Sequence, residues 1–70
     1  MEAIIKNQAI KRANGYGQYI VSGNVNGVDV TTRTTNSEAF DWFDDDSNEE
    51  KHQDAIQSVN IMLEVAYANL

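Results

Sequence analysis

The residues best suited to chemistry lie in one stretch of the chain, Glu38–Asp54, called the acidic segment below. Eight acids and one base give this segment a net charge of −7, whereas the other residues carry three acids and four bases, a net of +1. The whole excess charge of the 70-residue chain, −6, therefore lies in the acidic segment. Carboxylates at this density can bind a cation, act as general acids or bases, or attract a basic partner.

A calcium site is the first chemistry to consider, and its pattern is incomplete. Asp44, Asp46 and Asn48 match the opening of a calcium-binding EF-hand loop. Glu49 then stands where that loop needs glycine, and Ala55 stands where it needs a bidentate glutamate. We therefore expect the acidic segment to bind divalent cations only weakly and without specificity.

Catalytic motifs are missing from the sequence. It has no cysteine, no serine within a Gly-x-Ser-x-Gly motif and no glycine-rich loop that opens a helix. The single histidine, His52, has the i, i+3 spacing of paired helical ligands with Glu49, but a metal would need further ligands from elsewhere. We therefore expect no enzyme, no catalytic residue, no metal and no cofactor, and a solvated His52 in the first turn of a helix.

A surface for a protein partner is the interpretation that the acidic segment favours. Asp44–Asp46 oppose the dipole at the C-terminal end of the expected helix, which indicates a role other than fold stability. Trp42 lies off the face that Phe40 and Phe43 share, and tryptophan is enriched at binding hot spots. Carboxylates spaced along a helix can also imitate a row of DNA phosphates. The predicted partner-binding residues are Glu38, Asp41, Trp42, Asp44, Asp45, Asp46, Glu49 and Glu50.

These features predict a small acidic inhibitor, or nucleic-acid mimic, that docks on a basic protein of the class that handles nucleic acids. In size, charge and lack of cysteine the chain resembles counter-defence proteins of phages and mobile elements, such as anti-CRISPR and anti-restriction proteins, and no motif assigns it to a family. Its negative charge disfavours direct binding to nucleic acid or to an anionic membrane. Without a secretory signal or an apolar run of about 20 residues, we expect a cytoplasmic location, in the host cell if the protein is phage-encoded.

The elements that position the acidic segment are expected to form a single α+β domain over residues 1–70. Three antiparallel strands in sequence order precede a short helix and a long C-terminal helix, which packs on one face of the sheet. Met1–Ala13 leaves helix and strand open, and its alternation favours a strand. Asn26–Gly27 predicts a type I′ turn between the second and third strands, which pairs Val25 with Val28 and Val21 with Thr32.

The register of the first hairpin follows from the cost of burying a lysine. A two-residue loop would bury Lys6, so we expect a three-residue loop at 14–16, which pairs Ala9 with Val21 and Ile5 with Val25. That register puts three isoleucines on the solvent face of the sheet, an apolar stripe typical of an interface. The alternative function is therefore a structural or assembly module that forms a homodimer or a complex subunit. Its predicted interface residues are Ile4, Ile10, Ile20, Ile61 and Val65.

Two capping boxes, Thr35-x-x-Glu38 and Ser47-x-x-Glu50, predict where the two helices begin. The helices are expected to end near Asp44 and Asn69. Apolar residues at i, i+3 and i+4 spacing predict the core face of the second helix. These residues are Ala55, Ile56, Val59, Met62, Leu63, Ala66 and Leu70.

Overall fold

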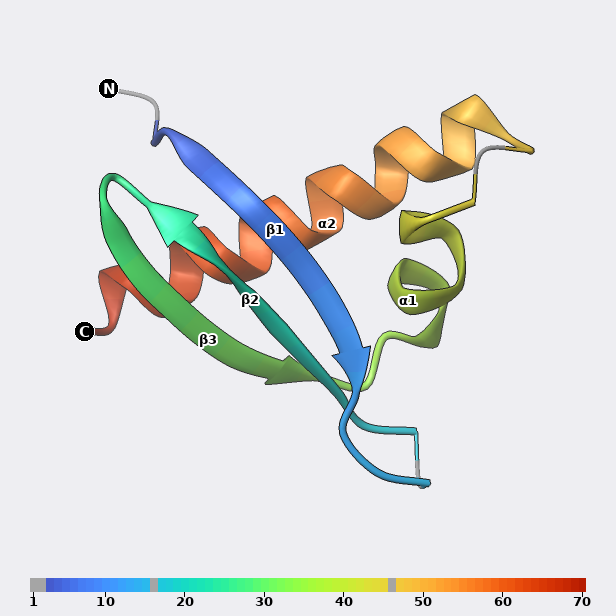
Figure 1. The fold of residues 1–70 in the computed structure, drawn as a ribbon, viewed down its shortest axis with the longest axis horizontal. Coiled ribbons are helices and arrows are strands. Elements are labelled where there is room, and N and C mark those ends of the chain that lie inside the picture. Colours follow the sequence, from blue (N-terminus) through green and yellow to red (C-terminus); the bar gives the residue numbers. More distant parts are fainter. Residues whose placement is uncertain (1–2, 16, 46) are drawn as a thin grey trace.

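The computed structural model describes residues 3–15, 17–45 and 47–70 and contains three strands and two helices. In chain order these are β1 (Ile5–Arg12), β2 (Tyr19–Val25), β3 (Val28–Thr34), α1 (Ser37–Phe43) and α2 (Glu49–Ala68). The strands form an antiparallel sheet in the order β1-β2-β3, and α2 crosses one face of it with α1 at one end (Figure 1). This arrangement confirms the predicted α+β fold, with a strand rather than a helix near the N-terminus.

The hairpin of β2 and β3 has the predicted turn and the predicted register. Asn26 and Gly27 have φ angles of 53° and 89°, the left-handed conformation that a type I′ turn requires at both positions. The side-chain oxygen of Asn24 accepts a hydrogen bond from the backbone N–H of Gly27 at 3.0 Å and supports the turn. Val25 pairs with Val28, and the pairing continues without interruption along both strands.

The hairpin of β1 and β2 departs from the prediction because β1 contains a β-bulge. Ile5 pairs with Val25 as expected, but the register shifts between Lys6 and Ala9, so that Ala9 lies opposite Ser22 instead of Val21. Asn7 within the bulge has a φ of 57°, which asparagine tolerates better than most residues. The shifted register leaves residues 14–17 as the connection, one more than predicted, and Tyr16 in it lies outside the described residues.

The bulge changes the face on which Ile10 lies. Ile10 pairs with Val21 and is buried in the core, so its predicted place in a solvent-facing isoleucine stripe is wrong. The physical reason is that one extra residue reverses the alternation of side chains, which turns both Ile5 and Ile10 inward. Ile20 is half-buried on the open face and Ile4, before β1, is 63% exposed. Their proposed interface role stays a prediction without the stripe.

Both helices begin one residue later than the capping boxes predict. Asn36 caps α1 by accepting a hydrogen bond from the backbone N–H of Ala39 at 3.1 Å, in place of Thr35. Asn48 caps α2 by accepting from the backbone N–H of Lys51 at 3.1 Å, in place of Ser47. Asparagine is as good an N-cap as serine and better than threonine, so the adjacent asparagine takes the position in each case.

The core lies between the sheet and the middle of α2. Ala55, Val59 and Leu63 are the buried residues of α2, in agreement with the predicted stripe, and Val21 and Val25 face them from β2. The last member of the predicted stripe, Leu70, is 80% exposed because α2 ends before it. Ile61 and Val65, two of the predicted interface residues, lie off the stripe and are exposed. Within the described residues, neither helix combines the length and the apolar character needed to cross a bilayer.

Candidate partner-binding surface

The predicted partner-binding residues lie on α1, in its connection to α2 and in the first turn of α2. This part of the chain, residues 38–52, is called the helical elbow below. Glu38 and Asp41 are exposed on α1, and Asp44 is its exposed C-cap residue. Glu49 and Glu50 are exposed in the first turn of α2, where their charge favours the positive end of the helix dipole. The structure thus brings α1 and the start of α2, which carry these acids, to one end of the molecule (Figure 1), and Asp46 lies outside the described residues.

Trp42 is half-buried beneath the only base of the acidic segment. The Nζ atom of Lys51 lies 4.5 Å from the centre of the indole ring, a distance at which the ammonium group is attracted to the aromatic face. This contact joins α1 to the first turn of α2. Among the described residues Lys51 forms no ion pair with an acid, although its charge contributes to stabilising the Asp45 carboxylate.

His52 packs against α1 and does not have the solvated position that its sequence predicts. It is half-buried, its ring centre lies 6.5 Å from that of Phe43, and its Nδ1 atom lies 3.4 Å from the backbone oxygen of Trp42. The oxygen of Trp42, at the end of α1, also accepts a hydrogen bond from the backbone N–H of Asp45 at 3.3 Å. His52 is therefore a residue that holds the helical elbow. Its contacts cross between helices, and no local sequence signal indicates them.

Asp45 has a local role in the turn that follows α1. Its side-chain oxygen accepts a hydrogen bond from the backbone N–H of Ser47 at 2.8 Å. Hydrogen bonds from the Ser47 side chain and backbone stabilise the carboxylate and lower the pKa of Asp45 below its ordinary value. Asp45 therefore also has a structural role, because its short polar side chain favours such a turn.

The lowered pKa of Asp45 predicts a contribution to acid stability. Because the folded pKa lies below the unfolded one, the stabilisation is fully present above the ordinary aspartate pKa of about 3.9 and is lost as the pH falls through the folded value. We expect NMR titration of the side-chain carboxyl carbon to show the lowered pKa in the wild type. In the Ser47→Ala variant the pKa should rise towards the ordinary value. An unchanged pKa in this variant would contradict the role assigned to Ser47.

The bases other than Lys51 lie elsewhere in the molecule. Three cations, Lys6, Lys11 and Arg33, and one anion, Asp29, are placed by the register on the open face of the sheet, a net of +2. The guanidinium of Arg12 lies on the helix side, 5.2 Å from the ring centre of Phe40. Across the described residues no base forms an ion pair with an acid. Apart from Lys51, which contacts Trp42, the described bases of the chain are therefore separated from the acids of the helical elbow.

The described residues contain no group of three His, Cys, Asp or Glu side chains placed to hold a metal ion. No protein-family model, curated protein or solved structure matches the chain. The feature that most clearly indicates a function is the group of exposed carboxylates on α1 and the first turn of α2, together with the partly exposed Trp42.

Proposed function

We propose that this protein is a non-catalytic binder that docks its helical elbow on a basic surface of another protein. The supporting observation is that exposed acids of α1, which carries Trp42, and of the first turn of α2 form no ion pair with a base among the described residues. Unpaired surface charge of one sign contributes little to the stability of a fold. It does speed encounter with a partner of opposite charge and excludes partners of the same charge.

The class of partner follows from the spacing of the acids. Glu38 and Asp41 are three positions apart on α1, so their side chains start about 5–6 Å apart, and Asp44 and Asp45 continue the row of acids in the turn that follows. Phosphates along one DNA strand are spaced on a comparable scale, with one charge per about 3.4 Å of the helix axis. A surface that binds phosphates through lysine and arginine can therefore bind this row of carboxylates. We propose a basic nucleic-acid-handling protein as the partner, and inhibition by occupying its binding channel as the effect.

Trp42 gives the proposed surface its apolar centre. Aromatic residues carry a large part of the binding energy of many interfaces, and charged residues around them exclude water and set orientation. A partner arginine placed over the indole ring can replace the contact that Lys51 makes in the free protein. The exchange requires no change in the sheet or in the core of the domain.

The test compares two variants that change the net charge by the same amount. In Asp41→Asn/Asp44→Asn two of the exposed acids of the surface become neutral, while Glu64→Lys makes the same change of +2 on the far half of α2. Immobilised wild type is expected to retain basic proteins from a lysate of the native host, and 20-base-pair duplex DNA to compete with it for them. The double variant should retain about tenfold less, the effect of roughly 1.4 kcal/mol, and Glu64→Lys should retain as much as the wild type.

Salt provides a second readout of the same interaction. Charges at a protein surface are screened over about 8 Å at physiological ionic strength, so retention should fall steeply as sodium chloride is added. Equal retention by the wild type and the double variant, or retention indifferent to salt, would contradict the proposed function. Loss of retention in the Glu64→Lys control would show that net charge matters and the helical elbow does not.

A further inference from the structure

The outer edge of β3 has unpaired backbone groups. Beside a two-residue turn, alternate residues of β3 direct their N–H and C=O groups towards β2, beginning with Val28. The backbone groups of the residues between them, Asp29, Thr31 and Arg33, therefore point away from the sheet. Within the described chain no hydrogen bond reaches these outward groups. An edge of this kind is a template for pairing with another strand.

The two edges of the sheet differ in how they resist pairing. The outer edge of β1 is interrupted by the bulge at Asn7 and flanked by Lys6 and Lys11, two devices that block the addition of a strand. The strand β3 has seven residues in unbroken register, and the chain has no proline to interrupt it. The structure therefore leaves β3 as the edge that is open to a partner.

The residues of β3 are complementary to a second copy of the same strand. We propose that the chain forms a symmetric dimer in which two β3 edges pair antiparallel about Thr31. In this register Asp29 lies opposite Arg33 of the second copy, twice by symmetry, on the open face of the shared sheet. Because Thr31 of one copy faces Thr31 of the other, the outward N–H and C=O groups of the two strands face each other and can form hydrogen bonds. Opposite charges at facing positions stabilise an antiparallel pair. Only the register centred on Thr31 places Asp29 opposite Arg33 in both halves of the pair.

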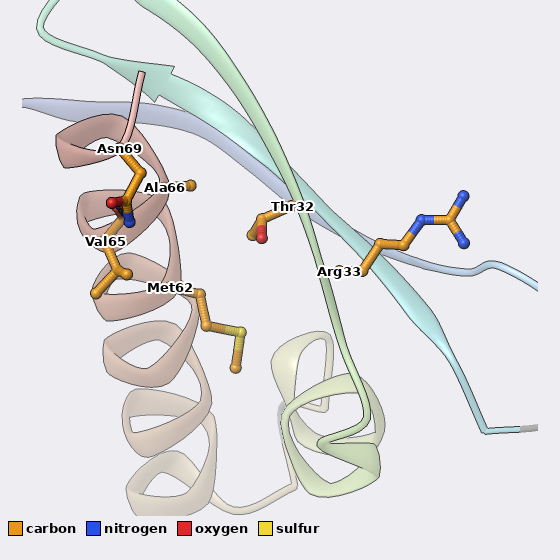
Figure 2. Close-up of a pocket in the computed structure, with 6 residues that line it drawn as sticks. All are labelled: Thr32, Arg33, Met62, Val65, Ala66 and Asn69. Atoms are coloured by element: carbon orange, nitrogen blue, oxygen red, sulfur yellow. Dashed lines mark hydrogen bonds between the residues drawn. The ribbon is translucent and has the colours of Figure 1, made fainter.

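The helix side of the β3 edge is a groove that a dimer would cover. It has a volume of about 500 Å³ and is lined by Thr32, Arg33, Met62, Val65, Ala66 and Asn69. Figure 2 shows Thr32 pointing towards α2 and Arg33 extending away from it on the other side of the strand. The symmetry axis is perpendicular to the shared sheet, so the grooves of both copies adjoin on one side. Apolar surface on Val65, now 57% exposed, would then be shielded from water.

The charges of Asp29 and Arg33 provide a test that is specific to this dimer. We expect the wild type to sediment at twice its 7.8 kDa mass at high concentration. Asp29→Arg gives the strand two cations and Arg33→Asp gives it two anions, so each variant alone should self-associate at least about tenfold more weakly. A mixture of the two variants should form dimers again, because each cation then faces an anion. Lys11→Glu, on the open face away from β3, should leave the dimer unchanged.

A cross-link tests the register even if a charge variant does not fold. Facing Cα atoms in a hydrogen-bonded antiparallel pair are about 5.5 Å apart, within the range of a disulfide. The chain has no cysteine, so Thr31→Cys should oxidise rapidly to a dimer, while Ser22→Cys on the central strand should not. A monomer at all concentrations, a dimer that neither charge variant weakens, or equal cross-linking by the two cysteine variants would overturn the proposal. None of these readouts depends on the helical elbow or on its partner.

Discussion

Replacing Leu63 by alanine should remove most of the stability of the domain. Leu63 has no exposed surface and lies where α2 meets the sheet, so the substitution removes buried methyl groups and leaves a cavity. Such changes cost about 3–4 kcal/mol. A domain of this size without disulfides seldom has more than about 3–5 kcal/mol in total. Urea denaturation followed by circular dichroism should show a transition near zero denaturant, or a chain that is largely unfolded in buffer.

The control for Leu63 is a residue of the same helix that is not in the core. Ile61 is 54% exposed, and Ile61→Ala removes similar methyl groups from an environment that is already partly solvated. Its cost should stay below about 1 kcal/mol. Similar losses from the two substitutions would show that α2 does not pack on the sheet through the face described here.

Adding a single methyl group to Gly23 should also destabilise the fold. A Cβ atom built on Gly23 lies 2.6 Å from Cδ1 of Leu63, a separation that carbon atoms do not reach, and 3.4 Å from the backbone oxygen of Lys6. Leu63 is enclosed by the core and cannot move aside freely. We therefore expect Gly23→Ala to cost about 1–3 kcal/mol, the usual range for overpacking.

Two comparisons separate this close contact from a general effect of glycine. Leu63→Val shortens the side chain that clashes, so Gly23→Ala should cost at least about 1 kcal/mol less in that background than in the wild type. Gly15 has no atom within 4 Å of the position that a Cβ would take, and Gly15→Ala should change the stability by less than about 0.5 kcal/mol. An additive result for Gly23 and Leu63 would contradict the contact between sheet and helix.

The sequence predicts the parts of this fold that depend on local signals. Asn26–Gly27 determines the turn type, and a two-residue turn determines the register of β2 and β3, so both are confirmed. The bulge in β1 has no such signal, because Asn7 is one polar residue among several. Its cause is tertiary, since only an extra residue lets Ile5 and Ile10 both face the core while Lys6 stays outside.

The candidate surface shows the same division between local and tertiary causes. The exposure of Glu38 and Asp41 follows from charge and helical spacing, and the sequence predicts it. The contact of Lys51 with Trp42 joins residues nine positions apart on different helices, and no spacing rule connects them. The turn at Asp45 has a local signal, an aspartate two residues before a serine, which is obscured by the neighbouring acids.

The separation of charge described above gives the molecule a permanent electric dipole moment. Carboxylates gather at the helical elbow, while Lys6, Lys11 and Arg33 lie on a different side, on the open face of the sheet. In the field of a positively charged body such a molecule experiences a torque as well as an attraction. The molecule is therefore oriented during diffusion with the helical elbow towards the positive body, so that a larger share of collisions begins with the elbow facing the partner. Replacing the three cations of the open face by acids would weaken this alignment without changing any residue of the helical elbow.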